Sequence, residues 1–219
     1  NLGLCWHRLD EEEKAIIAFK SHLYYLLQQS SHTSYDPIAY KYRPYTKYLI
    51  KSLEDEMIGL TSPTTFNDPF DCPIIELLNN DEKVSGLIRQ AYNDCLKIAC
   101  FSSNFKLPYP DHENGEVIQE EKQKESMPGY CNELMWAHYA DSHQGVCIKY
   151  HFPFSLTQLA GEKDGVICYF KDVRYSSQDL YQYSEKGSIN LYDAFFLKGE
   201  KWMYENELRF LYFSLDGRP

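Results

Sequence analysis

The first hydrophobic pattern in the chain lies between Asp10 and Gln29. Apolar side chains recur there every three or four residues, the spacing of one face of an α-helix, at Ala15, Ile16, Phe19, Leu23, Leu26 and Leu27. The acidic first turn suits the positive end of the helix dipole. The polar segment Ser30–Pro37 predicts a linker. Residues 1–37 are therefore expected to form a helical extension that covers the core or pairs two subunits.

From Ile38 onward, short strand patterns are interspersed with helical ones. Period-two alternation and short apolar runs predict strands over 38–43, 57–63, 97–103, 145–152, 165–175 (one or two strands) and 207–215. Three-and-four spacing predicts helices over 45–57, 81–96 and 132–141. The stretch 104–130 has no periodicity and predicts a long surface loop. We expect an α+β fold over 38–219: a mixed, mostly antiparallel sheet with flanking helices in a single domain.

Composition narrows the function classes. The net charge of −10 at pH 7 argues against nonspecific binding to nucleic acid or to an anionic membrane face, because no excess of cations is present to neutralise phosphates. No apolar run reaches the roughly 18 residues that a membrane span needs. The seven cysteines form no CxxC pair and follow no secretory leader, so we expect a soluble cytoplasmic protein with reduced thiols. The 19 tyrosines suit the walls of a cleft or an interface.

The stretch FNDPFD, residues 66–71, follows the second predicted strand. Asn67 and Asp68 precede a proline, an arrangement that favours a turn, so one interpretation is purely structural. The alternative is that this loop carries function and that Asp68 and Asp71 contact a metal ion or a ribose. The sequence leaves both interpretations open.

The segment MWAHYADSHQG, residues 135–145, places His138 and His143 five residues apart. Zinc helices usually place two histidines four apart, so no metal ligands are predicted here. Trp136, His138 and Tyr139 either line a pocket through stacking and hydrogen bonds or pack their helix onto the core.

The segment KWMYENELRF, residues 201–210, contains two glutamates and an arginine at alternate positions. On an extended chain Glu205, Glu207 and Arg209 share one face, while Leu208 and Phe210 point into the core. Such a row is commonly a solvated, salt-bridged edge. Two carboxylates held by an arginine are also used in glycosidic chemistry, because a nearby negative charge stabilises an oxocarbenium-like transition state.

Three motifs follow one another in an order that resembles one class of ADP-ribosyltransferases: Arg43 ending a strand, Phe101-Ser102-Ser103 ending another, and Glu205-Asn206-Glu207 before the last. The Ser-Thr-Ser of that class reads Ser-Ser-Asn here. The fuller set YKYR, TSPTTFNDPFD, CFSS, LMWAHYADSHQGVCI and KWMYENELRF closely resembles a bacterial domain family of unknown function, sometimes found near antiphage genes, over Ile38 to about Phe213. The resemblance to ADP-ribosyltransferases implies an ADP-ribosyltransferase-like fold and NAD as substrate.

The transferase resemblance also implies roles for individual residues. Arg43 would clamp the diphosphate or ribose, Ser102 would bind the nicotinamide ribose, and Tyr42, Phe101 or Trp136 would stack on nicotinamide. Glu207 would polarise the ribose 2′-hydroxyl and Glu205 would activate the acceptor, a protein or a nucleic acid. The remaining residues expected to bind NAD are Asn67, Asp68, His138 and Tyr139. The activity would suit a toxin or an antiphage effector.

Two other functions fit the same residues. One is a metal-dependent nuclease or phosphoesterase in which Asp68, Asp71, Glu205, Glu207 and His138 surround a divalent ion. The other is a noncatalytic module whose tyrosine-rich cleft binds a nucleotide or a partner protein. All three hypotheses require different groupings of the same side chains.

Overall fold

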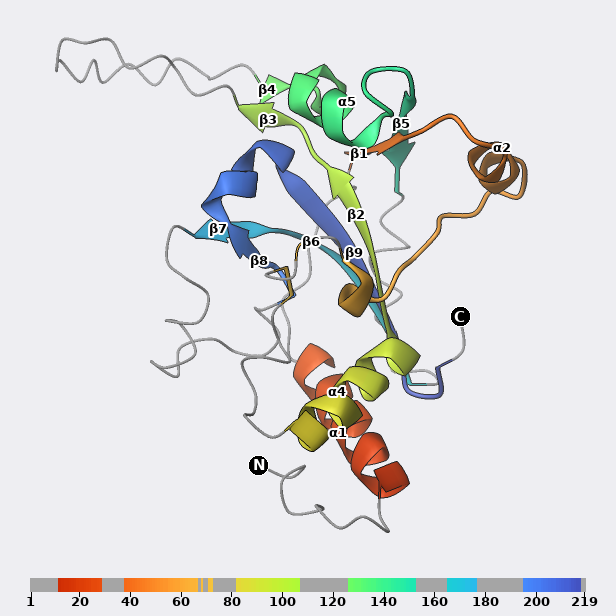
Figure 1. Cartoon of the computed structure of the whole chain (residues 1–219), viewed down its shortest axis with the longest axis vertical. Helices are drawn as coiled ribbons and strands as arrows, with labels where there is room; N and C mark the ends of the chain where they lie inside the picture. Colours follow the sequence, from red (N-terminus) through yellow and green to blue (C-terminus); the bar gives the residue numbers. More distant parts are fainter. Residues whose placement is uncertain are drawn as a thin grey trace, which may run out of the picture.

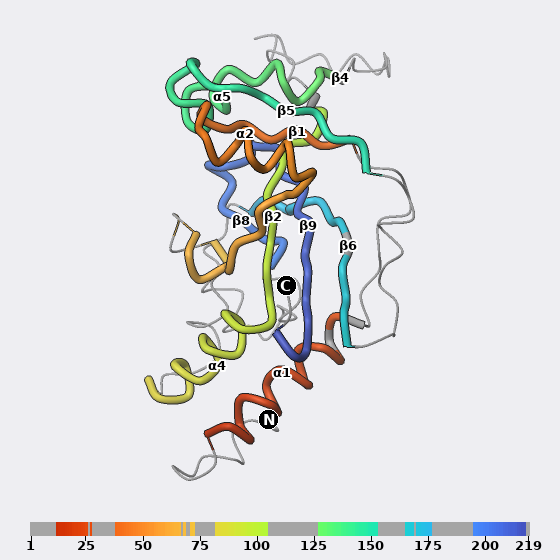
Figure 2. Tube along the Cα trace, turned by 90° about the vertical axis from the view of Figure 1, so that its right-hand side faces the viewer, coloured from red at the N-terminus to blue at the C-terminus, as the bar shows by residue number. Residues whose placement is uncertain are grey.

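A computed structural model describes residues 12–28, 38–66, 68, 71–72, 82–106, 126–152, 165–176 and 195–217. Its centre is a five-stranded sheet of order β5-β1-β2-β9-β6, in which every neighbouring pair is antiparallel. The strands are β1 (Ile38–Arg43), β2 (Leu96–Ser102), β5 (Val146–His151), β6 (Val166–Asp172) and β9 (Glu207–Ser214). Figure 2 shows β2, β9 and β6 side by side along most of their length. The predicted α+β fold with a mostly antiparallel sheet is confirmed.

Shorter elements surround this sheet. The α-helices are α1 (Glu12–Gln28), α2 (Lys47–Glu54), α4 (Glu82–Cys95) and α5 (Glu133–Tyr139), and the 3-10 helices are η3 (Pro63–Thr65), η4 (Gly129–Cys131) and η5 (Glu200–Glu205). Two small sheets pair β3 (Phe105–Lys106) with β4 (Ser126–Met127) and, in parallel, β7 (Arg174–Ser176) with β8 (Leu197–Gly199). In Figure 1, α1 and α4 lie together at one end of the sheet, and α5 lies at the other.

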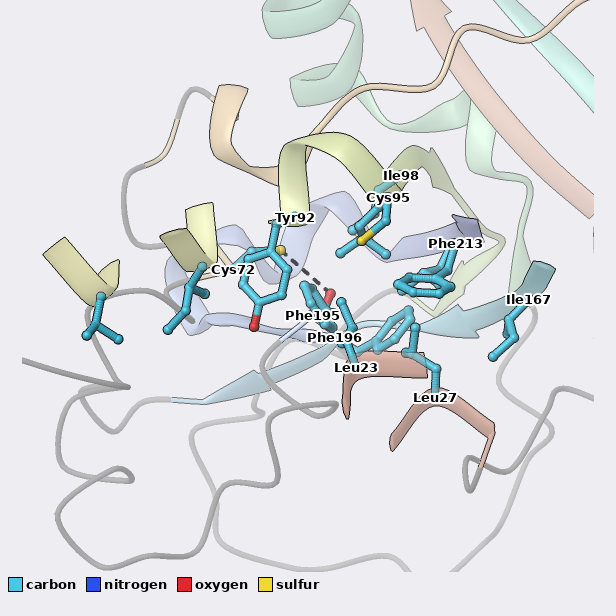
Figure 3. Packing of buried hydrophobic residues seen from close by; sticks show 14 residues of the cluster. Leu23, Leu27, Cys72, Tyr92, Cys95, Ile98, Ile167, Phe195, Phe196 and Phe213 are labelled. Atoms are coloured by element: carbon cyan, nitrogen blue, oxygen red, sulfur yellow. Dashed lines mark hydrogen bonds between the residues drawn. The ribbon is translucent and has the colours of Figure 1, made fainter. Parts of the chain in front are cut away.

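One face of the sheet changes from apolar to charged along its length. The β2–β9 register pairs Leu96, Ile98, Cys100 and Ser102 with Phe213, Leu211, Arg209 and Glu207, respectively. Directly paired residues of an antiparallel ladder point to the same face. The apolar pairs join the core cluster under α1 and α4, together with Phe195 and Phe196 (Figure 3). The last two pairs carry the charged and polar groups of the site described below.

The opposite face of the sheet holds a second, smaller core. Its buried members are Ala39, Ala99, Phe101, Phe152, Phe170 and Leu208. Phe101 contacts the rings of Tyr150, Phe152 and Phe170, with centroids 5.4–6.3 Å apart. Because Phe101 anchors this aromatic group, its position between Cys100 and Ser102 fixes which face those two side chains occupy.

The predicted strand over 57–63 is wrong. Only Thr61 meets β2 there, through paired backbone hydrogen bonds with Ile98. The chain turns into η3 at Pro63, and proline lacks the N–H that a longer ladder would need. The loop predicted over 104–130 contains β3 near its start and β4 and the first residues of η4 near its end, while residues 107–125 lie outside the described residues.

The described residues also bear on the expectations about membrane-spanning segments and cysteines. No helix among them is long and apolar enough to span a membrane. The described cysteines, Cys72, Cys95, Cys100, Cys131, Cys147 and Cys168, form no disulfide with one another, and the expected reduced state of the thiols stays a prediction.

Helix α1 packs into the main core through Leu23 and Leu27, which Figure 3 shows beside the phenylalanine rings.

The division of the chain into an extension and a domain at residue 37 stays a prediction, and a substitution tests it. Leu27 is fully buried, so Leu27→Ala should lower the free energy of unfolding by about 2–5 kcal/mol. Ile17→Ala, on the exposed side of the same helix, should change it by less than about 0.5 kcal/mol. Equal urea midpoints for both variants would instead indicate a detachable extension.

Candidate functional site

A cavity of about 450 Å³ lies where β1 separates from β2. The two strands pair only at Tyr40 and Ser102; farther along, Thr61 takes the place of β1 beside β2. The lining includes Tyr40, Lys41, Tyr42 and Arg43 of β1, Cys100, Phe101 and Ser102 of β2, and Asp71, Tyr139, Lys198, Glu205 and Glu207. Since side chains of both faces contribute, the cavity occupies the gap between the strands.

The segment from β8 through η5 to β9 brings three charged side chains to this cavity. Lys198 lies on β8, Glu205 ends η5, and Glu207 begins β9. Asn206 between the glutamates has φ 42°, a left-handed conformation that asparagine tolerates better than most residues. Its amide donates to Ser103 Oγ and to the carbonyl of Asn104, both at 2.6 Å, which ties this turn to the end of β2.

The predicted extended run through 205–210 is therefore wrong at its first two residues. Glu205 lies on a 3-10 helix and not on the strand. Glu207 and Arg209 do share one strand face, as predicted, but this face is not a solvated edge, because β9 lies between β2 and β6 and Arg209 is 0% exposed.

Arg209 organises the buried half of the charge cluster. Its Nη2 donates to both carboxylate oxygens of Asp71, each at 2.7 Å, and its Nε donates to Glu207 Oε1 at 2.7 Å. Nη1 donates to the carbonyl of Phe195 at 2.7 Å, and the guanidinium carbon lies 5.4 Å from the centre of the Phe66 ring. A planar guanidinium is suited to such forked contacts. FNDPFD therefore supplies both an aromatic ring and a carboxylate to hold Arg209.

Lys198 joins the same carboxylates from the other side. Its Nζ lies 2.5 Å from Glu205 Oε2, 3.1 Å from Glu207 Oε2 and 3.4 Å from Asp71 Oδ2. Tyr139 donates its hydroxyl to Glu205 Oε1 at 2.5 Å. The two glutamates thus share one ammonium at the cavity wall, although they come from different elements.

The pKa values of the two glutamates move in opposite directions. Burial raises the pKa of Glu205, and the opposing effects of Lys198 and Tyr139 do not fully offset it. Burial also acts to raise the pKa of Glu207, but Arg209 and Lys198 together outweigh it and hold that pKa below its ordinary value. Glu207 is therefore a persistent anion, and Glu205 can exchange a proton nearer neutral pH.

Ser102 lines the cavity and has a buried hydroxyl without a partner in the described part of the chain. The residue is 2% exposed, and its Oγ has no hydrogen-bond partner among the described residues. Leaving a buried hydroxyl unpaired costs free energy, on the order of 1–3 kcal/mol. A polar ligand atom in the cavity would remove that cost.

The structure brings together most of the residues expected to bind NAD. Arg43, Tyr42, Phe101, Ser102, Tyr139, Glu205 and Glu207 line the cavity, whereas Asp68, Trp136 and His138 are not among the lining residues. Asp68 is buried, Trp136 packs edge-on against Tyr42, and His138 lies beside Tyr204. Asn67 lies outside the described residues.

Sequence reasoning missed the two lysines of the site. Lys198 follows the buried apolar residues Phe195, Phe196 and Leu197, and a single lysine ending such a run is a signal for a buried ion pair. Lys41 lies between two tyrosines in a strand, where alternation gives no sign of a ligand contact.

The chain was compared with known proteins. Residues 135–210 match the family model DUF2971, a protein of unknown function. The DUF2971 match confirms the predicted resemblance to a domain family of unknown function, and it includes Tyr139, Lys198, both glutamates and Arg209. The motifs YKYR, TSPTTFNDPFD and CFSS precede the matched region. No curated protein matches the chain, and no solved structure matches it. The link from DUF2971 to ADP-ribosyltransferases stays a prediction.

Proposed function

We propose that the protein cleaves the glycosidic bond between nicotinamide and ribose in NAD and passes ADP-ribose to water or to a protein or nucleic-acid acceptor. The observation that supports this most is the pair of glutamates on one ammonium, Glu205 with a raised pKa and Glu207 with a lowered one. Carboxylates tuned in opposite directions are typical of glycosidic chemistry, in which one exchanges a proton and the other stays ionised.

Residues that line the cavity can carry out each step of the proposed reaction. The bond between ribose C1′ and the nicotinamide nitrogen breaks, and its electron pair neutralises the pyridinium. Positive charge develops on C1′ and the ring oxygen, where the carboxylate of Glu207 stabilises it. The oxygen of water or of an acceptor then bonds to C1′, and its proton passes to Glu205 and on to solvent. Each carboxylate oxygen has two lone pairs, so Glu205 can accept that proton while Tyr139 and Lys198 hold it.

The rest of the cavity suits a nucleotide. Ser102 Oγ would bond a ribose hydroxyl, and the rings of Tyr40, Tyr42 and Phe101 provide surfaces for a base or for nicotinamide. The volume lies within the roughly 300–1,000 Å³ of small-molecule sites.

A metal-dependent nuclease is a weaker candidate for a specific reason. The ammonium of Lys198 stands among Asp71, Glu205 and Glu207, at the place where a divalent ion would need the same oxygens. The described residues contain no group of three histidines, cysteines or acids arranged to hold a metal ion.

Incubation of the purified protein with NAD tests the proposal. We expect release of free nicotinamide, detected by chromatography, with ADP-ribose either in solution or on an added protein or nucleic acid. Absence of nicotinamide release with every acceptor would contradict it. In cells, the same activity would deplete NAD and halt growth, which is the behaviour proposed for a toxin or antiphage effector. The exposed Tyr25 of α1 would serve a homodimer or a partner protein.

The raised pKa of Glu205 gives a pH dependence. As a general base Glu205 must be ionised, so kcat/KM for NAD should rise as pH increases through a pKa above the ordinary value of 4.5. The Glu205→Gln variant should lose this acidic limb, whereas Glu200→Gln, at an exposed position of η5, should retain it. An unchanged limb in Glu205→Gln would assign the titration to another group.

A further inference from the structure

The cavity has cationic and anionic walls. Asp71, Glu205 and Glu207 supply carboxylates on one side, and these are engaged by Lys198 and Arg209. Lys41 and Arg43 lie two residues apart on β1, so their side chains leave the strand on the same side. Tyr40 points to the face of Ser102 and Glu207, because the three are paired in register. Lys41 and Arg43 therefore belong to the opposite wall.

Lys41 has hydrogen-bonding capacity that the described residues do not use. Its Nζ donates to the carbonyl of Cys100 at 2.9 Å and lies 4.9 Å from the centre of the Phe101 ring. An ammonium has three donors, so two remain. Among the described residues no carboxylate forms an ion pair with Lys41 or Arg43, in contrast to Lys198 and Arg209. Burial lowers the pKa of Lys41, and Arg43 adds to the lowering.

A second, independent observation indicates that a ligand belongs between these walls. Ser102 Oγ is buried, lines the same cavity and has no hydrogen-bond partner in the described part of the chain. Ser102 ends β2 directly after Phe101, over whose ring Lys41 lies. Two cations without a carboxylate partner in the described ranges, a buried hydroxyl without a partner there, and two carboxylates with opposite pKa shifts match a ligand with an anionic group, a sugar hydroxyl and a carbon that becomes cationic.

We propose that Lys41 joins Arg43, whose phosphate contact the transferase resemblance already implies, in a phosphate subsite, so that the cavity recognises a ribose 5′-phosphate with its anomeric carbon toward Glu205 and Glu207. The orientation of the sugar rests on the proposed glycosidic function, whereas the phosphate subsite does not. The mononucleotide half of NAD then contains every group that the cavity recognises. Nicotinamide mononucleotide is accordingly a substrate, and the riboside, which lacks the phosphate, is a poor one.

Kinetics with the two truncated substrates test this subsite. We expect wild-type kcat/KM to be higher for nicotinamide mononucleotide than for nicotinamide riboside. In Lys41→Met the ratio of the two values should fall about tenfold to a hundredfold, the usual range for loss of a charged hydrogen bond. Lys41→Arg should retain much of the preference. Lys149→Met, at an exposed lysine of β5, is the matched control and should keep the wild-type ratio. Equal ratios in wild type and Lys41→Met would overturn the proposal.

Calorimetry separates failure of the subsite from failure of the proposed function. Ribose 5-phosphate should bind the wild-type protein more tightly than ribose does, and Lys41→Met should reduce that difference. This result would support the subsite even if neither truncated substrate were cleaved. Equal binding of ribose 5-phosphate and ribose would contradict the phosphate subsite. Equal affinity for ribose 5-phosphate and inorganic phosphate would instead contradict recognition of the sugar, because the ribose would then make no contact. Unfolding temperatures of each variant verify that the comparison is between folded proteins.

Discussion

Replacing Glu207 by glutamine is expected to lower kcat/KM for nicotinamide release from NAD by about 10²–10³-fold. Glu207 is 4% exposed and lines the cavity, and its carboxylate is the persistent anion that would face the developing positive charge. Removing one preorganised electrostatic contact in a water-poor site typically has an effect of this size. Initial rates of nicotinamide release over a range of NAD concentrations provide the measurement.

A matched variant separates this effect from a loss of stability. Glu200→Gln makes the same change at an exposed position of η5 and should keep the wild-type rate. Because Glu207→Gln leaves Arg209 and Lys198 with less counter-charge, its unfolding temperature must be measured, and rates compared well below it. A folded Glu207→Gln protein with wild-type kcat/KM would exclude a catalytic role for this carboxylate.

The second large effect concerns stability: Arg209→Met should lower the free energy of unfolding by about 3–5 kcal/mol. The arginine is fully buried; its Nε and Nη2 donate to the two carboxylate oxygens of Glu207, and Nη2 also donates to both oxygens of Asp71. Its loss leaves the buried carboxylates with Lys198 as their one remaining cation among the residues that the structure describes, and breaking a buried ion pair from one side has a cost of this order. Urea unfolding followed by circular dichroism measures the change.

Arg89→Met on α4 is the control for this prediction, because Arg89 is exposed and its loss should change stability by less than about 0.5 kcal/mol. Arg209→Lys keeps the charge but not the planar fork, so it should recover only part of the loss.

The pKa of Glu207 gives the sign of the pH dependence of stability. Since that pKa is depressed, its stabilising contribution is complete above the unfolded value and is lost as pH falls through the folded one. Equal stabilities of Arg209→Met and Arg89→Met would contradict a central role for the charge cluster.

Local sequence patterns predicted most helices and strands correctly because their hydrophobic spacing agrees with the tertiary packing. The helix expected over 81–96 is α4, whose buried positions include Val84, Ile88 and Ala91, spaced by three or four residues. The strand expected over 57–63 failed for the opposite reason. The segment is apolar, as a strand would be. However, its pairing with β2 is limited to Thr61 and Ile98, because the chain turns into η3 at Pro63.

The charge cluster was predictable only in part, because its ion pairs join residues far apart in sequence. Asp71 and Arg209 are 138 residues apart, and no local pattern links them. Alternation placed Glu207 and Arg209 on one face correctly, but it could not indicate that this face is buried and that Phe66 and Asp71 contact Arg209 there. Alternation also could not predict the left-handed conformation of Asn206. Because of this turn, Glu205 lies outside the strand, but its carboxylate still contacts Lys198.

The most direct test of the proposed site is a crystal structure of the protein with ADP-ribose, the product of the proposed cleavage. We expect the ribose C1′ that had carried nicotinamide to lie about 3.5 Å from carboxylate oxygens of Glu205 or Glu207, with Ser102 Oγ bonded to that ribose. The adjacent phosphate should contact Lys41. Clear density for ADP-ribose elsewhere on the protein, with the cavity between β1 and β2 unoccupied, would contradict the proposal.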